Sequence, residues 1–569
     1  MALSLISLGL TGLHRLLSAP LRLALYGLGR MRLGRRGVVR LPLAPGRDGD
    51  SQHHRVRLLN TLQELGDDPA VAEVVLDLDG LSVGWSGIQD LQQGIRRLKG
   101  TGTRVTAHVD GAGLRELSLL ATLDRATLTP SAELMLTGLG ARLAFYADAL
   151  DLIGVEVQVE SAGRFKSFGE SYIRTYASQE NREQLRELLT DLQDQLLGAI
   201  ALARPQSAAP LTTLLGQAPQ DADSVLDAGL VDALAYPDEL KANRRAVHGS
   251  ELSVMSYSAY SWSRGWSRRL GRKQLGGPVV AVVHLEGAVT YGEQSRRSAS
   301  ISSDTVVPLL NGLAEQSQVS AVVLSVQSPG GSALASDLIA RAVRRLGEKK
   351  PVVAVFGDVS ASGGYYLAAP AAEIIARPGT ITGSIGVVGG KPVFAAALAR
   401  LGVRDETVAV GPDAGMFGPF AAFTPDQRRR YQASIARAYD RFLGVVSAGR
   451  RMPREAVHAV AQGRVWTGKQ ALGHGLIDHI GDVHTGLGRA RVLSGLGPSE
   501  GRVVHFRTAP PRWRGLMDLA SGRGQVEALS ALAGLHLVPG AAVLAPLLPL
   551  LRRQPHHPLA LMPLPDLLD

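Results

Sequence analysis

The chain of 569 residues contains no cysteine. This absence excludes disulfide frameworks, thiolate zinc sites, iron–sulfur clusters and cysteine nucleophiles, and it leaves the redox compartment open. Aromatic residues are scarce at 5% of the chain, which disfavours the stacking surfaces that bind single-stranded nucleic acid. Apolar residues at 45% and charged residues at 20% are typical of folded proteins, so this length predicts several domains.

The net charge of +10 is concentrated at the N-terminus. Residues 1–57 carry ten arginines against Asp48 and Asp50, which leaves only +2 for the rest of the chain. Leucines alternate with these arginines, and this pattern favours an anionic membrane surface over nucleic acid as the partner. Because the uncharged stretch 1–13 is too short to span a bilayer, we expect a helix that lies on the membrane, with a solvated N-terminus as the alternative.

An internal duplication with an offset of 248 residues extends over about eighty positions. Residues 74–76 (VVL) recur at 322–324, and residues 96–98 (RRL) recur at 344–346. The expected division is a basic apolar N-terminal segment (1–54), an N-terminal repeat (55–245), a linker (246–275), a C-terminal repeat (276–495) and a Pro/Leu-rich tail (496–569). Three prolines in the uncharged stretch 528–551 disfavour a spanning helix, so we expect the tail to pack on the body or on a neighbouring subunit, with membrane contact as the alternative.

Valine- and isoleucine-rich runs alternate with helical patterns in the C-terminal repeat. The expected strands are 278–285, 321–326, 351–356 and 373–376, and the expected helices are 305–316, 333–346 and 361–369. This order predicts an α/β fold made of two tandem βαβ domains with parallel strands. Functional groups should therefore gather in the loops beyond the carboxyl ends of the strands.

Two short motifs are weak candidates for a site. Residues 80–84 (GLSVG) match a nucleophile elbow around Ser82, but the duplicated turn at 327–331 has no comparable serine. Residues 463–470 (GRVWTGKQ) differ by one residue from a phosphate-binding loop, with glutamine in place of the hydroxyl that holds magnesium. A helical pattern also precedes this segment where a strand is required.

A stronger candidate begins after the strand 351–356, where residues 357–366 (GDVSASGGYY) place Ser362 at the start of a helix. Unpaired N–H groups and the helix dipole at this position stabilise an alkoxide or an oxyanion. The turn 328–332 (SPGGS) follows the neighbouring strand, so Gly331 and Gly363 are candidates for an oxyanion hole. A helix-capping serine and a structural glycine turn are the alternatives.

The base that a nucleophilic serine needs is not an obvious histidine here. A lysine can replace it when burial favours the neutral amine. The chain has only eight lysines against 53 arginines, so Lys166 in the mixed loop 163–168 (GRFKSF) is more informative than usual. A surface lysine is the alternative.

Taken together, these motifs resemble the signal peptide peptidase A family, also called protease IV, in its long two-domain form. The motifs are residues 361–366 (ASGGYY), 328–332 (SPGGS), 382–386 (TGSIG), 463–468 (GRVWTG) and 165–167 (FKS). The resemblance covers residues 55–495. Five ordered motifs on a duplicated chain are more specific than any one of them.

The resemblance implies a Ser-Lys endopeptidase with crotonase-like or Clp-protease-like domains and without cofactor or metal. By motif, Ser362 is the nucleophile, Lys166 the general base and Ser384 the hydroxyl that orients the lysine, while Gly331 and Gly363 fit the oxyanion hole. Each repeat keeps one half of the pair, since Leu114 stands opposite the serine and Ala414 opposite the lysine.

The resemblance also implies a membrane-associated homo-oligomer, commonly a tetramer, that degrades remnant signal peptides. Its catalytic body is expected on the extracytoplasmic side of a bacterial inner membrane. Two other functions remain open at this stage: a crotonase-like acyl-thioester enzyme, which uses paired N–H groups on the same fold, and a non-catalytic membrane scaffold.

Overall fold

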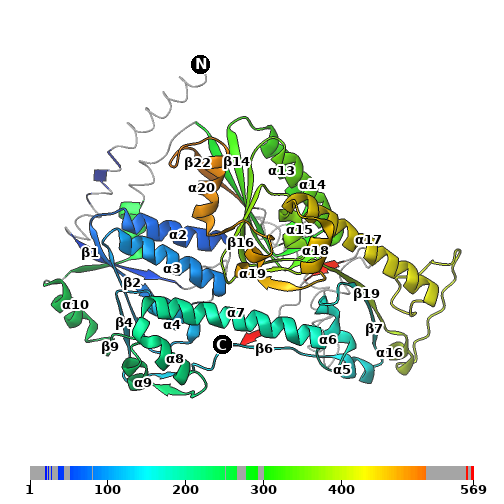
Figure 1. The fold of residues 1–569 in the computed structure, drawn as a ribbon, viewed down its shortest axis with the longest axis horizontal. Helices are drawn as coiled ribbons and strands as arrows, with labels where there is room; N and C mark the ends of the chain where they lie inside the picture. The colour runs from blue at the N-terminus through cyan, green and yellow to red at the C-terminus, as the bar shows by residue number, and fades with distance from the viewer. Residues whose placement is uncertain are drawn as a thin grey trace.

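Two α/β units lie side by side and are joined by a third sheet (Figure 1). The computed structural model describes residues 20–21, 23–24, 27, 36–43, 52–79, 81, 83–249, 252–265, 277–292, 300–507, 559–561 and 566–568. Among these residues, no helix combines the length and the apolar character needed to cross a bilayer.

The first sheet consists of six parallel strands. Their order is β10 (Ser253–Ser256), β1 (Gly37–Pro42), β2 (Val71–Asp77), β3 (Arg104–Val109), β4 (Arg125–Leu128) and β9 (Ala233–Leu234). Central strand β2 is largely buried, which explains its nearly continuous run of alanine, valine and leucine. Helices α2 (Gln52–Gly66) and α3 (Trp85–Gly100) contact both this sheet and the second one.

The second sheet belongs to the C-terminal repeat. Its strands run in the order β20 (Val465–Thr467), β18 (Ile381–Gly383), β16 (Val352–Ala361), β14 (Val319–Ser328), β11 (Val279–Glu286) and β22 (Arg502–Arg507), with β17 (Glu373–Ala376) beside β16 and β21 (His479–Ile480) beside β17. The four expected strands are confirmed, and they pair in parallel. The three expected helices are present as α13 (Ser303–Glu315), α14 (Ala333–Gly347) and α15 (Gly363–Ala368).

Strand β16 is longer than the sequence predicted. It continues beyond Phe356 to Ala361. Its register with β14 shifts after Phe356, and its last residues also pair with β18. The strand therefore leads directly into the turn that carries Ser362.

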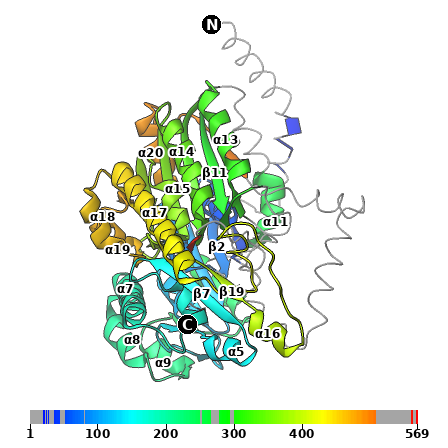
Figure 2. The same cartoon turned by 90° about the vertical axis from the view of Figure 1, so that its right-hand side faces the viewer.

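The duplication predicted from the sequence is visible in the long helices. Helix α7 (Gln179–Ala203) and helix α17 (Pro425–Arg450) occupy equivalent places in the two repeats and have 25 and 26 residues. Figure 2 shows α17 crossing the C-terminal unit in front of α15, while α7 lies in the lower unit. The fold is thus α/β with an internally duplicated unit, as expected.

A third sheet joins the two repeats. Its order is β13 (Ser300–Ser302), β12 (Ala288–Thr290), β15 (Gly330–Ser332), β23 (Leu559–Leu561), β19 (Val387–Val393) and β7 (Glu156–Ala162). Strand β7 of the N-terminal repeat runs antiparallel to β19 of the C-terminal repeat, with Ala162 opposite Val387. This pairing carries the loop after β7 to the turn before β19.

Further helices complete the layers around the sheets. They are α4 (Leu114–Leu120), α5 (Ala147–Leu152), α6 (Glu170–Ile173), α8 (Ala208–Leu214), α9 (Ala222–Asp227), α10 (Leu240–His248), α11 (Tyr257–Tyr260), α16 (Ala395–Arg400), α18 (Arg454–Val460), α19 (Gly468–Gly473) and α20 (Val483–Leu493). Short strands β5 (Glu133–Leu134) and β8 (Gln220–Asp221) pair with each other, and β6 (Gly140–Arg142) pairs with β24 (Asp566–Leu568).

Several strands fall in segments that the sequence analysis set apart from the repeats. Strand β1 lies within the expected N-terminal segment, β10 lies within the expected linker, and β22 lies within the expected tail, yet each pairs with a repeat's sheet. The exact domain boundaries stay a prediction. The expectations for residues 1–13 and 528–551 concern positions outside the described residues.

Candidate active site

Ser362 occupies a sharp turn between a strand and a helix. It directly follows β16 and precedes the first residue of α15, with a φ of 55° and a ψ of −117°. A positive φ is rare for a residue with a side chain and stores about 1–3 kcal/mol of strain. The backbone N–H of Ser362 donates to the carbonyl of Gly383 at 2.8 Å, which helps to hold the turn.

Lys166 reaches Ser362 from the N-terminal repeat of the same chain. It lies four residues beyond the end of β7, and only 4% of it is exposed. Its Nζ is 2.8 Å from Ser362 Oγ, and Ser362 is fully buried. The pairing of β7 with β19 thus brings together two residues that are 196 positions apart in the sequence.

Burial controls the electrostatics of this lysine. Removal of the ammonium group from water lowers the pKa of Lys166 well below its ordinary value of 10.5. The amine can therefore be neutral at a much lower pH than that of a surface lysine. A neutral amine has a lone pair that can accept a proton.

Ser384 contacts the lysine amine through two of its oxygen atoms. Lys166 Nζ is 2.9 Å from Ser384 Oγ and 3.0 Å from Ser384 O. Ser384 also has a positive φ, 51°, and its backbone N–H donates to the carbonyl of Arg464 at 2.7 Å. Two N–H groups of a neutral amine can donate to Ser384 while the lone pair faces Ser362.

The two candidate oxyanion glycines lie against each other. A Cβ on Gly363 would come within 3.1 Å of the Gly331 nitrogen and 2.6 Å of Ser336 Oγ. A Cβ on Gly331 would come within 2.1 Å of the Val289 carbonyl oxygen, so only glycine fits there. The structure therefore brings both glycines to the turn that carries Ser362.

The family model of peptidase family S49 matches residues 114–249 and 344–497, together half of the chain. The chain belongs to this family. It is 30% identical to "Serine protease SPPA, chloroplastic" of Arabidopsis thaliana, over 80% of this chain and 68% of the relative. It is 28% identical to "Protease 4" of Salmonella typhi, over 85% of this chain and 79% of the relative. It is 38% identical to "Putative signal peptide peptidase SppA" of Enterococcus faecium, over 20% of this chain and 34% of the relative. The chain is accordingly a serine peptidase.

The segment that resembles a phosphate-binding loop has a different place in this S49 peptidase. As expected from its sequence, helix α18 precedes it rather than a strand. Gly463 packs against Lys166, since a Cβ there would lie 2.6 Å from the lysine Cβ, and the Gln462 carbonyl accepts the N–H of Phe165 at 2.9 Å. The segment therefore supports the lysine loop. The other weak candidate, Ser82, lies outside the described residues.

Gln184 is a supporting residue that the sequence analysis missed. Its buried amide donates to the Phe165 carbonyl and to Ser167 Oγ, both at 3.2 Å, and accepts the N–H of Val465 at 3.3 Å. It thereby connects α7 to the loop that carries Lys166 and to the segment 463–468 that packs against this loop. Its spacing of four from Leu188 on the buried side of α7 is the signal that could have identified it.

A buried ion pair behind the serine was also missed. Asp358, four residues before Ser362, pairs with Arg55 of α2 and accepts hydrogen bonds from Ser86 Oγ at 2.7 Å and from the N–H of Gly87 at 3.0 Å. Although burial opposes ionisation, Arg55 and these donors lower the pKa of Asp358. The turn that carries Ser362 is thus fastened to the N-terminal repeat.

Proposed function

We propose that this S49 peptidase is a Ser-Lys endopeptidase that cleaves extended apolar peptides, including remnant signal peptides. The observation that carries the proposal is the 2.8 Å approach of Lys166 Nζ to Ser362 Oγ in a buried site. Ser362 is the nucleophile, Lys166 the general base, Ser384 the positioning residue for the amine, and the N–H groups of Gly331 and Gly363 form the oxyanion hole.

In the acylation step, Ser362 Oγ attacks the scissile carbonyl while its proton passes to the neutral Lys166 amine. The resulting ammonium then gives this proton to the leaving amine as the peptide C–N bond breaks, and an acyl-enzyme remains. Water attacks the ester in the second step, with the lysine again taking and returning one proton. No group from outside the chain is needed for proton balance.

Charge develops on the carbonyl oxygen in both steps. Backbone N–H groups fixed in a site from which water is excluded stabilise this charge without reorganisation. The contact between Gly331 and Gly363 supports their joint role, because both turns then face one bound carbonyl. The strained φ of Ser362 keeps its Oγ at this point, beside the lysine.

The third sheet supports binding of substrate as an extended strand. Strand β23 from the C-terminal tail runs antiparallel to β15, with Ala560 opposite Gly331. A peptide that added to β15 in this manner would place its backbone beside the proposed oxyanion glycine. The names of the relatives support signal peptides as the substrate class.

Competition between the tail and substrate tests this binding mode. A chain that ends at residue 507 lacks β23, so we expect a severalfold lower KM for a long apolar peptide. A synthetic peptide of residues 555–569 should then inhibit the shortened chain, which would support a binding strand shared by the tail and the substrate. An unchanged KM would contradict competition between this tail and substrate.

Peptidase activity is tested by hydrolysis of a quenched apolar peptide. Ser362→Ala and Lys166→Met should each lower kcat/KM about 100- to 10,000-fold. Ser360→Ala and Lys391→Met are matched controls, because both residues are buried and donate hydrogen bonds to carbonyl oxygens outside the proposed site. Full activity in either of the first two variants would overturn that residue's role, whereas turnover of an acyl thioester by Ser362→Ala would favour the crotonase-like alternative.

We further propose a homo-oligomer, a tetramer by family resemblance. The segment 401–424 extends away from the body between α16 and α17 (Figure 1) and exposes Val408 and Val410 almost completely. Exposed apolar side chains grouped in this way favour contact with another protein surface. Val408→Asp with Val410→Asp should reduce the mass measured by light scattering, whereas Val492→Asp on α20 should not.

We also propose that the chain acts at a membrane, with its catalytic body on the extracytoplasmic side of a bacterial inner membrane. The arginine-rich N-terminal segment supports attraction to anionic lipids. Co-sedimentation with vesicles that contain anionic lipids should require residues 1–35, and protease protection in intact cells would report the side. Equal sedimentation after removal of these residues would contradict this role.

A further inference from the structure

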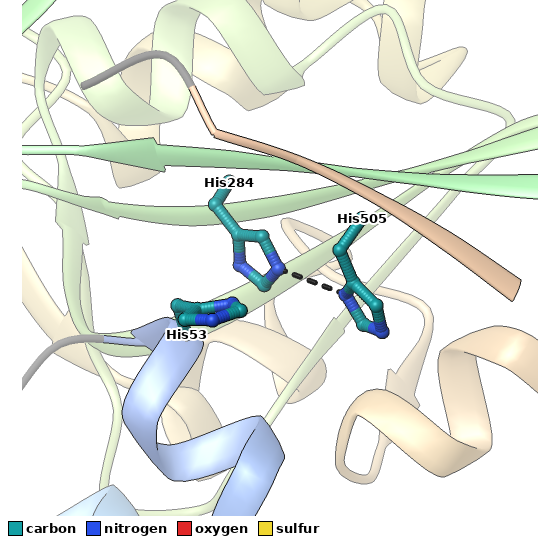
Figure 3. Close-up of side chains that lie close together, drawn as sticks. All are labelled: His53, His284 and His505. Atoms are coloured by element: carbon teal, nitrogen blue, oxygen red, sulfur yellow. Dashed lines mark hydrogen bonds between the residues drawn. The ribbon is translucent and has the colours of Figure 1, made fainter. Parts of the chain in front are cut away.

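Three histidines from distant parts of the chain meet beside the second sheet (Figure 3). His53 lies in the first turn of α2, His284 on β11, and His505 on the edge strand β22. One ring nitrogen of each lies within 4.8 Å of those of the other two. His284 Nε2 is 3.0 Å from His505 Nδ1, and the ring of His53 stands edge-on to that of His284 with centroids 5.0 Å apart.

The environment favours the neutral form of these rings. Burial, followed by the effect of the neighbouring His505, lowers the pKa of His284 to about 3. Burial also lowers the pKa of His505. The 3.0 Å contact between His284 Nε2 and His505 Nδ1 needs a proton on one of these two nitrogens, so an ion that binds both nitrogens displaces this proton from between them.

We infer that His53, His284 and His505 form a binding site for a divalent transition-metal ion of the zinc class. Imidazole nitrogens bound to one Zn²⁺ at tetrahedral angles lie about 3.4 Å apart, given Zn–N distances of about 2.0–2.1 Å. His284 Nε2 and His505 Nδ1, at 3.0 Å, are slightly closer than this value, and all three ligand nitrogens lie within 4.8 Å of one another, so small rotations of the rings are sufficient. Three neutral nitrogen ligands suit zinc, copper and nickel and do not suit magnesium or calcium.

Two charged groups near the cluster affect the bound ion in opposite ways. The carboxylate of Glu286 accepts the backbone N–H of His53 at 3.0 Å and places negative charge beside the site. Arg507 lies close enough to lower the pKa of His284, so its charge opposes a cation. With three protein ligands, the fourth coordination position is left to solvent.

The proposed metal site is separate from the Ser-Lys site. It joins α2, which belongs to the N-terminal repeat, to β11 and β22, two neighbouring strands of the second sheet. A bound ion would therefore stabilise the association of these three elements and would take no part in peptide hydrolysis. No metal is expected from the sequence, because ligands on three separate elements leave no local spacing motif.

The test uses the full chain after treatment with a chelator. Equilibrium dialysis with Zn²⁺ should show one equivalent bound, and Zn²⁺ should raise the Tm measured by calorimetry. His53→Gln and His505→Gln should each weaken binding about 100-fold or more and remove the Tm shift. Loss of a metal ligand should weaken binding more than loss of a residue that only hydrogen-bonds to a ligand, which typically costs about 10- to 100-fold. His458→Gln is the matched control, because His458 is exposed and contacts Tyr439 far from this cluster.

Binding of less than one equivalent at micromolar free Zn²⁺, or equal binding in the cluster variants and the control, would overturn the site. Both substituted histidines are only partly buried, which limits damage to the fold. If these variants nevertheless unfold, X-ray absorption of the zinc-loaded wild-type chain decides the question. Three imidazole ligands at about 2.0–2.1 Å would support the site, and fewer would overturn it.

Discussion

Both repeats lead from a strand into a helix, but the connecting residues differ in number and in backbone conformation: residues 110–113 join β3 to α4, whereas Ser362 alone joins β16 to α15. In the N-terminal repeat, Gly113 directly precedes α4, one position before the Leu114 that the duplication aligns with Ser362. It has an extended backbone with a φ of −90°, and the carboxylate of Glu116 accepts its N–H at 3.0 Å. In the C-terminal repeat, Ser362 has a φ of 55° and faces a lysine amine. Duplication thus retained the strand and the helix, while the connection between them differs at the position of the proposed nucleophile.

The two repeats also differ at the position of the lysine, and here the N-terminal repeat carries the functional group. Lys166 is buried because β7 pairs with β19 and carries the following loop into the interface of the repeats. Its counterpart, Ala414, lies in the exposed segment between α16 and α17. Each repeat therefore holds one half of the proposed dyad, and the interface between the repeats completes it.

The largest expected effect comes from moving the lysine to the other repeat. Lys166→Ala should lower kcat/KM about 100- to 10,000-fold, and adding Ala414→Lys should restore nothing, because position 414 is exposed. An equimolar mixture of Ser362→Ala and Lys166→Ala should stay inactive, since both groups come from one chain. Recovery of activity in the mixture would show instead that dyads form between chains.

The pH profile measures how far burial has changed this lysine. The base must be neutral, so kcat/KM should rise with pH until the lowered pKa of Lys166 is passed and then level off well below pH 10.5. Ser384→Ala removes an acceptor that stabilises the ammonium form, so the rising limb should move to lower pH as kcat falls. A profile that stays flat between about pH 5 and 9 would contradict lysine as the base.

The repeats also offer a matched pair of aspartates for a stability experiment. Asp358→Asn should cost about 3 kcal/mol of unfolding free energy, because Arg55 would lose its close partner in a buried site. The equivalent Asp110 is 75% exposed, so Asp110→Asn should change stability by less than about 0.5 kcal/mol. Urea denaturation of both variants checks the difference, and equal losses would show that the ion pair contributes little.

The sequence was sufficient for the parts of this molecule that depend on local pattern. The strands and helices of the C-terminal repeat could be predicted because buried parallel strands form continuous valine and isoleucine runs and the helices have a clear period. The motifs also pointed to Ser362, Lys166 and Ser384, and the structure places Lys166 Nζ within 3.0 Å of both serines.

What the sequence could not provide depends on contacts between distant segments. The extension of β16 to Ala361 requires a second partner strand, β18, whose pairing has no local signal. Arg55 and Asp358 are 303 positions apart, so nothing near either residue reveals their ion pair. The pairing of β23 with β15 likewise joins the tail to a turn in the C-terminal repeat, and a Pro/Leu-rich composition does not specify such a register.

The smallest expected effect isolates the strain in the turn that carries Ser362. Ser362→Gly and Ser362→Ala both remove the hydroxyl and should be equally inactive, but glycine adopts a φ of 55° without steric cost. The glycine variant should therefore be about 1 kcal/mol more stable than the alanine variant. The same comparison at position 113, where φ is −90°, should reverse the sign, with Gly113→Ala at least as stable as the wild type. Equal stability of the two Ser362 variants in urea would show that the turn relaxes when the hydroxyl is lost, and strain would then not be what distinguishes the repeats.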